Sequence, residues 1–387
     1  MQLDADVCIV GGGVMGAATA YAISRMADQR IILIDRYGVG NEYCSSNDVN
    51  RVFRYSYGND QYYTKMAIES LRLWREIEEE TGRELLIPAG LLMLEGQDER
   101  ANKFNESSFK MLTDLGLGAE VYEGPGLKKR FPQFQANMGF FDPHGGVLLA
   151  SKSLETFASR SGARGVRILE KHVTAFRDKS GLEIETSHGE TIRARKLVVT
   201  VGPWSNSFLR DGMTGIIPTR QQLVYLKPSR DLVKFQPTSC PVFFTDHHYG
   251  LPAVGIDGVK ISNKELTDPV DPETARRSVD QDQIEQCRAA CREFIPDLAD
   301  GEVIRTKVCL YDMTENSDFV IDRDPDNRDI VYGYGFSGHG FKFAPLIGKL
   351  LAELTLDREP SFDISRYSIR RSLRKPRITG GQLGKGE

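Results

Sequence analysis

A glycine-rich turn near the start of the sequence constrains the fold more than any other feature. Gly11, Gly13 and Gly16 follow an apolar run at residues 5–10 and precede a segment with helical patterning at residues 15–26. In this G-x-G-x-x-G pattern the first glycine makes a tight turn, the second lets a pyrophosphate approach the backbone, and the third lets helix and strand pack. The pattern predicts a strand, a turn and a helix whose N-terminus binds a dinucleotide.

An acidic residue completes this unit. A second apolar run at residues 30–34 ends in Asp35, about 20 residues after Gly16, where a carboxylate accepts hydrogen bonds from an adenosine ribose. The unit by itself is compatible with NAD and with FAD. Two later turns favour FAD, because they bring more backbone to a long ligand. They are Gly202-Pro-Trp204, after the apolar run 197–201, and the glycine-rich turn 335–340.

The length of 387 residues exceeds the size at which a single core keeps growing, so we expect two domains. Nucleotide-binding patterns return twice, whereas the stretch 216–324 has period-two segments typical of antiparallel strands. We predict an α/β chain of α+β two-domain type. It combines a discontinuous, Rossmann-like FAD-binding domain (1–85, 147–215 and 325–370) with an antiparallel-sheet substrate domain (86–146 and 216–324), and 371–387 is expected to be a disordered tail.

Local patterns predict further elements outside the glycine unit. The segment 40–63 is too long and too polar for a simple connector, which is typical of a functional loop. We predict helices near 64–81, 98–115, 153–163, 280–293 and 345–355, and strands near 91–94, 147–149, 166–176, 181–186, 197–201, 222–226, 258–262 and 330–333.

Charge and hydropathy exclude several classes of partner. The net charge is −4, with 50 basic and 54 acidic residues spread along the chain, so nothing indicates nucleic-acid binding. No apolar stretch approaches the roughly 18 residues that a membrane span needs, and the start of the chain lacks a secretory signal. We expect a small-molecule substrate, no membrane association and a monomer.

The six cysteines are dispersed, which favours a reducing compartment, and we expect the cytoplasm. Cys287 and Cys291 are four residues apart in a helical stretch without a nearby histidine. We interpret them as one face of a helix and predict no metal site.

Two blocks in the C-terminal half identify a family. They are Lys307-Val-Cys309-Leu-Tyr311, followed by Asp318-Phe-Val-Ile-Asp322, and Gly335-Phe-Ser-Gly338-His339-Gly340-Phe-Lys342-Phe. With them, most of residues 4–370 resembles the monomeric sarcosine oxidase family, which includes N-methyltryptophan, pipecolate and fructosyl amino acid oxidases. These are FAD-dependent amine oxidases of the D-amino acid oxidase-like superfamily. The resemblance implies a thioether between Cys309 and the flavin.

The resemblance also implies roles for residues around the flavin. Arg54 and Lys342 would bind the substrate carboxylate, a role that suits the planar fork of an arginine and a second positive charge. Arg51 would lie against the flavin ring, and Lys260 near flavin N5, where a positive charge stabilises superoxide. The remaining implied residues are Tyr249 and Tyr311 at the substrate cavity and Ser45, Ser46, Gly338, His339 and Gly340 at the cofactor.

One departure from the family pattern concerns the substrate. Sarcosine-specific members carry a histidine four residues after the active-site lysine, and this chain has Lys264 there. Lys264 would meet a second anionic or polyhydroxyl group, as in a fructosyl or N-alkylated dicarboxylic amino acid, or lie exposed at the surface. We predict an oxidase of a small secondary amino acid that uses oxygen and forms hydrogen peroxide. The alternatives are a fructosyl amino acid or pipecolate-type oxidase and a flavin dehydrogenase that reduces another carrier.

Overall fold

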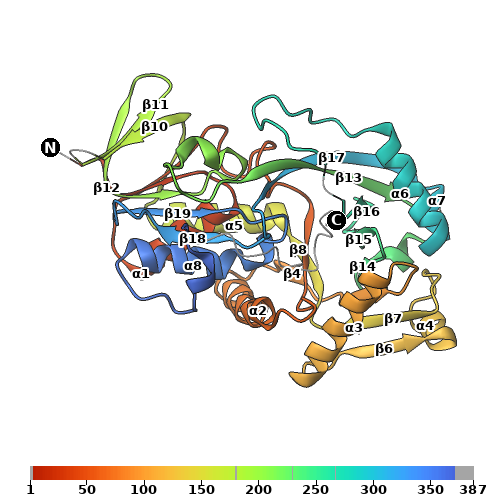
Figure 1. The fold of residues 1–387 in the computed structure, drawn as a ribbon. Helices are drawn as coiled ribbons and strands as arrows, with labels where there is room; N and C mark the ends of the chain where they lie inside the picture. The colour runs from red at the N-terminus through yellow and green to blue at the C-terminus, as the bar shows by residue number, and fades with distance from the viewer. Residues whose placement is uncertain (1–2, 179–180, 229, 266, 371–387) are drawn as a thin grey trace.

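The computed structural model describes residues 3–178, 181–228, 230–265 and 267–370. Two large sheets dominate the fold (Figure 1). The strands of a small third sheet occur where the chain passes from one large sheet to the other. The tail predicted at 371–387 lies outside the described residues. None of the helices in the described part has the length and apolar character needed to span a bilayer.

The first sheet contains the glycine unit. Its eight strands are β1 (Ala5–Val10), β2 (Ile31–Asp35), β9 (Arg167–Glu170), β10 (Val173–Arg177), β11 (Leu182–Thr186), β12 (Thr191–Val199), β18 (Val320–Arg323) and β19 (Ile330–Tyr334). The strand order is β10-β11-β12-β1-β2-β9, with β19 beside β12 and β18 beside β19. The strands β9, β2, β1, β12 and β19 pair in parallel. The strands β1, β2 and β19 are apolar and mostly buried, as expected for parallel strands covered on both faces, whereas the edge strand β9 is mostly exposed.

Helices cover this sheet. They are α1 (Val14–Met26), α2 (Gln61–Thr81), α5 (Ala150–Ala163) and α8 (Ala344–Thr355). The helices α1 and α8 lie side by side (Figure 1). A glycine allows this close approach, because a Cβ on Gly348 would lie 2.6 Å from the backbone carbon of Ala18. The packing of α1 and α8 fixes the helix N-terminus that follows the glycine turn.

The second sheet also has eight strands, and most of its pairs are antiparallel. The exception is the parallel pair of β14 (Val242–Phe244) and β5 (Leu91–Leu94). The other strands are β6 (Glu120–Glu123), β7 (Met138–Asp142), β13 (Ile217–Lys227), β15 (His248–Leu251), β16 (Val259–Asn263) and β17 (Glu302–Met313), in the order β17-β13-β16-β15-β14-β5-β7-β6.

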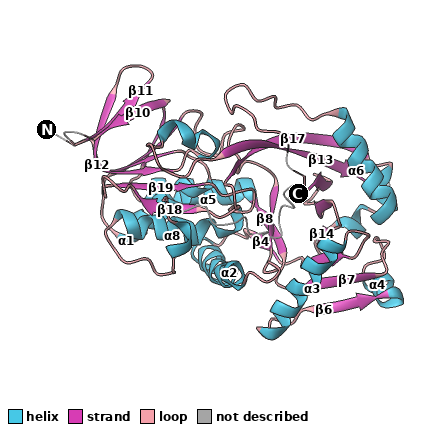
Figure 2. Cartoon of the chain, in the orientation of Figure 1, coloured by secondary structure: helices cyan, strands magenta, loops and turns pink. Residues whose placement is uncertain are grey.

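Four helices accompany the second sheet (Figure 2): α3 (Glu99–Asp114), α4 (Gly124–Arg130), α6 (Gln281–Phe294) and α7 (Pro296–Ala299). Cys287 and Cys291 are buried on α6 and belong to the apolar core beneath it. This packing agrees with their interpretation as one face of a helix. Short 3₁₀ turns occupy Gly202–Phe208, Leu232–Phe235, Phe341–Phe343 and Ser365–Tyr367.

The third sheet consists of β3 (Asn50–Phe53), β8 (Gly146–Leu149) and β4 (Leu86–Ile87), in the order β3-β8-β4. The strand β3 arises inside the segment predicted as a long loop. It positions Arg51 within the strand and Arg54 just after it. The third sheet therefore carries both arginines singled out by the sequence.

The predicted fold class, an α/β chain of two-domain type, is confirmed, whereas the domain boundaries stay a prediction. The expected strand at 166–176 was wrong in detail, because it is two strands that stand at opposite ends of the strand order of the first sheet. The strand β9 pairs with β2, and β10 begins the antiparallel edge. A backbone hydrogen bond from Lys171 to Asp35 holds the turn between them. The expected strand at 197–201 is the end of β12, which begins earlier and stops at Val199.

Candidate functional site

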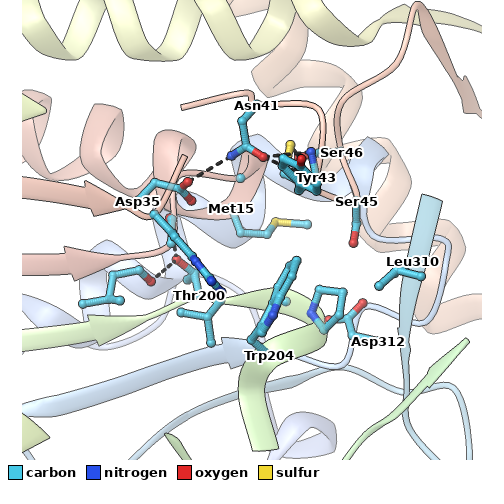
Figure 3. Close-up of a pocket in the computed structure, with 18 of the residues that line it drawn as sticks. Met15, Asp35, Asn41, Tyr43, Ser45, Ser46, Thr200, Trp204, Leu310 and Asp312 are labelled. Carbon is cyan, nitrogen blue, oxygen red and sulfur yellow. Dashed lines mark hydrogen bonds between the residues drawn. The ribbon is translucent and has the colours of Figure 1, made fainter. Parts of the chain in front are cut away.

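A cavity of about 380 Å³ lies at the carboxyl ends of β1 and β2. Gly11 and Gly13 line it. Figure 3 shows Asp35 at one end of the cavity and Leu310 and Asp312 at the other. Ligands of parallel α/β sheets bind in this position, outside the carboxyl ends of the strands. The cavity therefore begins at the glycine turn that the sequence predicts and extends to the strand that carries Cys309.

The glycine turn leaves no room for side chains. Gly11 has φ +106°, and a Cβ there would lie 2.4 Å from the carbonyl oxygen of Thr200. A Cβ on Gly16 would lie 1.9 Å from the carbonyl oxygen of Gly11. Ser46 accepts a hydrogen bond from the backbone N–H of Val14 at 3.0 Å, at the start of α1. These contacts pack the strand, turn and helix together, as the dinucleotide pattern requires.

Asp35 is held in place by its own loop. Its carboxylate accepts hydrogen bonds from the backbone N–H of Gly12 at 2.7 Å, from that of Tyr37 at 2.9 Å and from the side chain of Asn41 at 2.9 Å. Burial raises the pKa of Asp35. The carboxylate borders the cavity (Figure 3), and its bond to a ribose stays a prediction.

Other predicted cofactor contacts line the same cavity, among them Ser45, Ser46, Gly338 and Gly340. The hydroxyl of Ser45 is buried and has no hydrogen-bond partner among the described residues. A buried polar atom without a partner is costly unless a ligand or water satisfies it. The glycine cradle and this hydroxyl fit a dinucleotide cofactor such as FAD.

Five side chains meet where β17 approaches β3, and we call them the anchor cluster: the buried Asp48, Tyr225, Lys260 and Cys309 and the half-buried Arg51. Arg51 donates to the sulfur of Cys309 at 3.3 Å. It also forms an ion pair with Asp48. Arg51 lines the cavity, and Cys309 directly precedes the lining residue Leu310. The structure thus brings the predicted ring-contact arginine and the predicted anchor cysteine together.

Lys260 is fully buried in the anchor cluster. Its ammonium donates to Asp48 Oδ2 at 2.9 Å and to the carbonyl oxygen of Asn50 at 2.6 Å. Burial lowers the pKa of Lys260 to about 8, although the nearby Asp48 carboxylate opposes this change. Lys260 therefore changes charge near the physiological pH range.

The two predicted tyrosines lie together beside the anchor cluster. Tyr311 lines the cavity, and its hydroxyl interacts with that of Tyr249. Burial raises the pKa of Tyr249 and raises that of Tyr311 well above its usual range. Both hydroxyls are therefore neutral at physiological pH, able to donate and to accept hydrogen bonds.

The predicted carboxylate-binding residues form a second group around Tyr57. The ammonium of Lys342 donates to the hydroxyl of Tyr57 at 2.9 Å and to the carbonyl oxygen of His339 at 2.7 Å. The guanidinium of Arg54 lies 4.2 Å above the centre of the Tyr57 ring. Burial and the nearby Arg54 hold the pKa of Lys342 well below its usual range. Two buried cations thus share one aromatic neighbour.

The side chain of Lys264 shares an aromatic neighbour, Phe244, with Arg54. The Lys264 ammonium is 5.2 Å and the Arg54 guanidinium 5.5 Å from the centre of the Phe244 ring. Lys264 also donates to the backbone carbonyls of Thr245 and Asp246. Its pKa is lowered to about 8 by burial and by Arg54. Lys264 is half-buried, and the backbone carbonyls of the turn between β14 and β15 use part of its hydrogen-bonding capacity.

The ring of His339 does not line the cavity, although both neighbouring glycines do. Its Nε2 lies 3.0 Å from the carbonyl oxygen of Ser317, and its Nδ1 lies 3.3 Å from the Tyr57 hydroxyl. Burial, together with the charge of Lys342, holds the pKa of His339 well below its usual range. The imidazole is therefore neutral, and it contacts the Tyr57 hydroxyl. A contact between His339 and the cofactor stays a prediction.

The sequence analysis did not identify three residues of this region: Asp48, Asp312 and Tyr57. Tyr57 is the common neighbour of Arg54 and Lys342. The carboxylate of Asp312 accepts hydrogen bonds from the backbone N–H groups of Gly335 at 2.8 Å and Phe336 at 3.1 Å. Burial raises the pKa of Asp312 to about 6. One signal was available for Asp48 and Asp312, since each is an acid within three residues of a residue already assigned to the site.

Comparisons with known proteins agree with this geometry. Residues 6–354 match the family described as FAD dependent oxidoreductase. Monomeric sarcosine oxidase from Bacillus sp. (strain B-0618) is 30% identical, with 97% of this chain and 98% of that protein covered. N-methyl-L-tryptophan oxidase from Yersinia pestis (strain Pestoides F) is 26% identical, with 95% of this chain and 100% of that protein covered. The structure of L-proline dehydrogenase from P. horikoshii superposes with a TM-score of 0.83 at 20% identity and covers 96% of this chain and 98% of that one.

The family match spans nearly the whole chain, and the first relative is similar over almost its full length. The likeness to the dehydrogenase shows the shared fold alone. The chain therefore belongs to the FAD dependent oxidoreductase family and, within it, to the FAD-dependent amine oxidases that include monomeric sarcosine oxidase.

Proposed function

We propose that this enzyme oxidises a small secondary amino acid, such as sarcosine or another N-methyl amino acid, at the carbon next to nitrogen. The observation that carries the proposal is the buried cation pair around Tyr57. Lys342 is buried, and among the described residues its ammonium has the Tyr57 hydroxyl and the His339 carbonyl as partners and no acidic side chain. A buried ammonium of this kind is expensive unless an anion joins it. A substrate carboxylate would supply that anion, with Arg54 as its second ligand.

The chain's own residues would bind and orient the substrate. Arg54 and Lys342 hold the carboxylate, and the neutral hydroxyls of Tyr249 and Tyr311 can accept a hydrogen bond from the amine or donate to its lone pair. The positive surroundings lower the pKa of the bound amine and favour its neutral form, which is the form that can be oxidised. FAD, when bound, would accept the two electrons and pass them to oxygen. Substrate, oxygen and water then yield a carbonyl compound, an amine and hydrogen peroxide.

Lys260 is the proposed group for the reaction with oxygen. A positive charge beside the cofactor stabilises the superoxide anion that forms when oxygen takes up the first electron. Lys260 is buried within the anchor cluster, next to the cavity-lining Arg51. The same fold occurs in a dehydrogenase, so the fold does not decide between oxygen and another acceptor. Peroxide yield measures the acceptor directly.

Covalent attachment of the flavin through Cys309 is part of the proposal. Cys309 is buried, adjacent to the cavity and within 3.3 Å of an Arg51 nitrogen. Its position is consistent with an anchor at one end of the cofactor. A monomeric state and a cytoplasmic location stay predictions.

A larger substrate is the second candidate, and the position of Lys264 favours it. Lys264 is half-buried, and Arg54 lies close enough to lower its pKa, so a third positive charge lies in the same region. A fructosyl or N-alkylated dicarboxylic amino acid would bring an additional polar or anionic group. Against this role, two backbone carbonyls already bind the Lys264 ammonium.

A peroxide assay over a substrate panel tests both candidates. The panel contains sarcosine, other N-methyl amino acids, pipecolate, proline, fructosyl amino acids and N-alkylated aspartate, each compared with its amide or ester. We expect peroxide from a free carboxylate and a secondary amine, and little from the amides. If no secondary amino acid in the panel reduces the flavin, the proposal is wrong. Equal rates for acids and amides would reject the carboxylate clamp.

A further inference from the structure

The carboxylate of Asp48 joins side chains from three separate strands. Lys260 from β16 donates to its Oδ2 at 2.9 Å, Arg51 from β3 donates to the same oxygen, and the hydroxyl of Tyr225 from β13 donates to Oδ1. Asp48 has no exposed surface, and Lys260 has 1%. Both oxygens of one buried carboxylate are therefore occupied, and one of the three donors, Arg51, lines the cavity.

The backbone of Asp48 is fixed independently of these contacts. Its carbonyl oxygen accepts hydrogen bonds from the backbone N–H of Ser151 at 3.1 Å and from the Ser151 hydroxyl at 2.7 Å. The next residue, Val49, accepts from the N–H of Ala150 at 3.0 Å. These bonds tie the loop to the start of α5. The carboxylate thus projects from a rigid support towards two side chains, Arg51 and Lys260, whose long stems have many rotamers.

The charges in the anchor cluster do not cancel. Arg51 and Lys260 contribute two positive charges, and Asp48 contributes one negative charge. Without the carboxylate, the two cations would repel each other at short distance, and the one that can lose a proton would do so. Arginine stays charged in proteins, so Lys260 is the group that would respond.

We propose that Asp48 is a positioning residue that fixes Lys260 and Arg51 relative to each other at the edge of the cavity, and thereby sets the pH range in which the reduced enzyme reacts with oxygen. The inference rests on the proposed function in one respect, the role of Lys260 towards oxygen. It adds that Lys260 acts only as part of a pair with Asp48.

The charged and titratable groups that face Lys260 support this reading. They are Asp48 before β3, Arg51 on β3, Tyr225 on β13 and Cys309 on β17. Burial and Arg51 lower the pKa of Lys260 to about 8, whereas Asp48 raises it most and Cys309 raises it less. Loss of the negative charge at residue 48 therefore lowers this pKa further. Opposite charges at such distances change a pKa by roughly 1–3 units.

The first test measures oxygen reactivity without any amine substrate. Holoenzyme is reduced anaerobically with dithionite, freed of excess reductant and mixed with oxygenated buffer in a stopped-flow instrument between pH 5.5 and 9.5. We expect the wild-type rate constant to fall as the pH rises through about 8. In D48N the midpoint should move at least about one pH unit lower, and in D48E it should stay nearer the wild-type value. A D48N midpoint equal to that of the wild type would overturn the proposal.

A second variant guards against a folding defect in D48N. Tyr225→Phe removes one hydrogen bond from Asp48 and leaves every charge in place, so its midpoint should stay nearer the wild-type value than that of D48N, and a shift as large as that of D48N would overturn the assignment to the Asp48 charge. The matched control is Asp324→Asn. Asp324 is also buried and ion-paired, with Arg210 at 2.7 Å, and it does not line the cavity. Its midpoint should equal that of the wild type, and a D324N shift as large as that of D48N would overturn the assignment to Asp48.

A third measurement does not depend on activity. The melting temperatures of D48N, K260M and the double variant form a double-mutant cycle. D48N leaves a buried ammonium without its partner, so adding K260M should restore part of the lost melting temperature. Strictly additive losses would overturn the pairing. If K260M reacts with oxygen as fast as the wild type, the proposed role of Lys260 is wrong, and the thermal cycle still decides whether Asp48 positions Lys260.

Discussion

Replacement of Asp312 by asparagine should stabilise the protein above pH 6, with a size that follows from its burial. The carboxyl group of Asp312 is buried at the cavity wall, and its pKa is raised from 3.8 to about 6. One pH unit between the folded and unfolded pKa values corresponds to about 1.4 kcal/mol, so the ionised carboxylate costs the folded state about 3 kcal/mol. Asparagine keeps a neutral oxygen that can accept from the N–H groups of Gly335 and Phe336.

The sign of the pH dependence can be worked out from the two pKa values. Below about pH 4 the carboxyl group is protonated in both states and costs nothing. Between about pH 4 and 6 the folded protein keeps a proton that the unfolded chain has lost, so the free energy of unfolding falls as the pH rises. Above about pH 6 the full cost is present. The advantage of D312N over the wild type should therefore grow by about 3 kcal/mol between pH 4 and 7.

Urea unfolding at pH 4, 5, 6 and 7 measures this difference. Both proteins are held at the same saturating FAD concentration, because ligand binding adds to apparent stability. All other titrating groups are common to the two proteins, so their contributions cancel in the difference. Asp312→Ala is the control, since it also lacks the charge but leaves the two backbone N–H groups without an acceptor, so it should be about 1–3 kcal/mol less stable than D312N at every pH. A D312N advantage that does not change between pH 4 and 7 would refute the reasoning.

Three further predictions concern the site. Arg54→Ala should raise the Michaelis constant for carboxylate substrates about 10- to 100-fold, because a hydrogen bond to a charged group contributes roughly 1.5–3 kcal/mol; an unchanged constant in steady-state assays would exclude the clamp. Gly16→Ala should purify without flavin, since its Cβ would lie 1.9 Å from the Gly11 carbonyl oxygen, and a normal ratio of flavin to protein absorbance would contradict this. Cys309→Ser should release its flavin into the supernatant on acid precipitation, whereas the wild-type pellet stays yellow; wild-type flavin in the supernatant would show that no covalent bond exists.

Local features of the sequence were sufficient for the nucleotide-binding unit. The glycine turn, its flanking strand and helix, and Asp35 lie within one continuous segment, and their roles depend on backbone conformations that few residues allow. The apolar runs likewise predicted β1, β2 and α8 close to their observed bounds. The short strands β3, β14 and β15 were missed, because three- or four-residue strands hold too few positions for a periodic pattern.

The direction of side chains was decided by tertiary packing. The glycine-rich turn at 335–340 correctly placed backbone beside the cavity, and Gly338 and Gly340 line it. The ring of His339 instead packs against Phe319 and contacts the Ser317 carbonyl. Nothing in the sequence around His339 specifies this orientation, since its partners come from the loop before β18.

The sequence by itself determined that the chain binds a dinucleotide, and the family blocks marked Cys309, Lys260 and Arg54 as residues of interest. Only the tertiary structure decided that Lys260 and Arg51 share one carboxylate. Asp48 and Lys260 are 212 positions apart in the sequence, and they meet because β3 and β16 come together from different sheets. A lone aspartate in a polar loop has no local pattern, and its effect on a lysine depends on burial and distance, which only the folded chain defines.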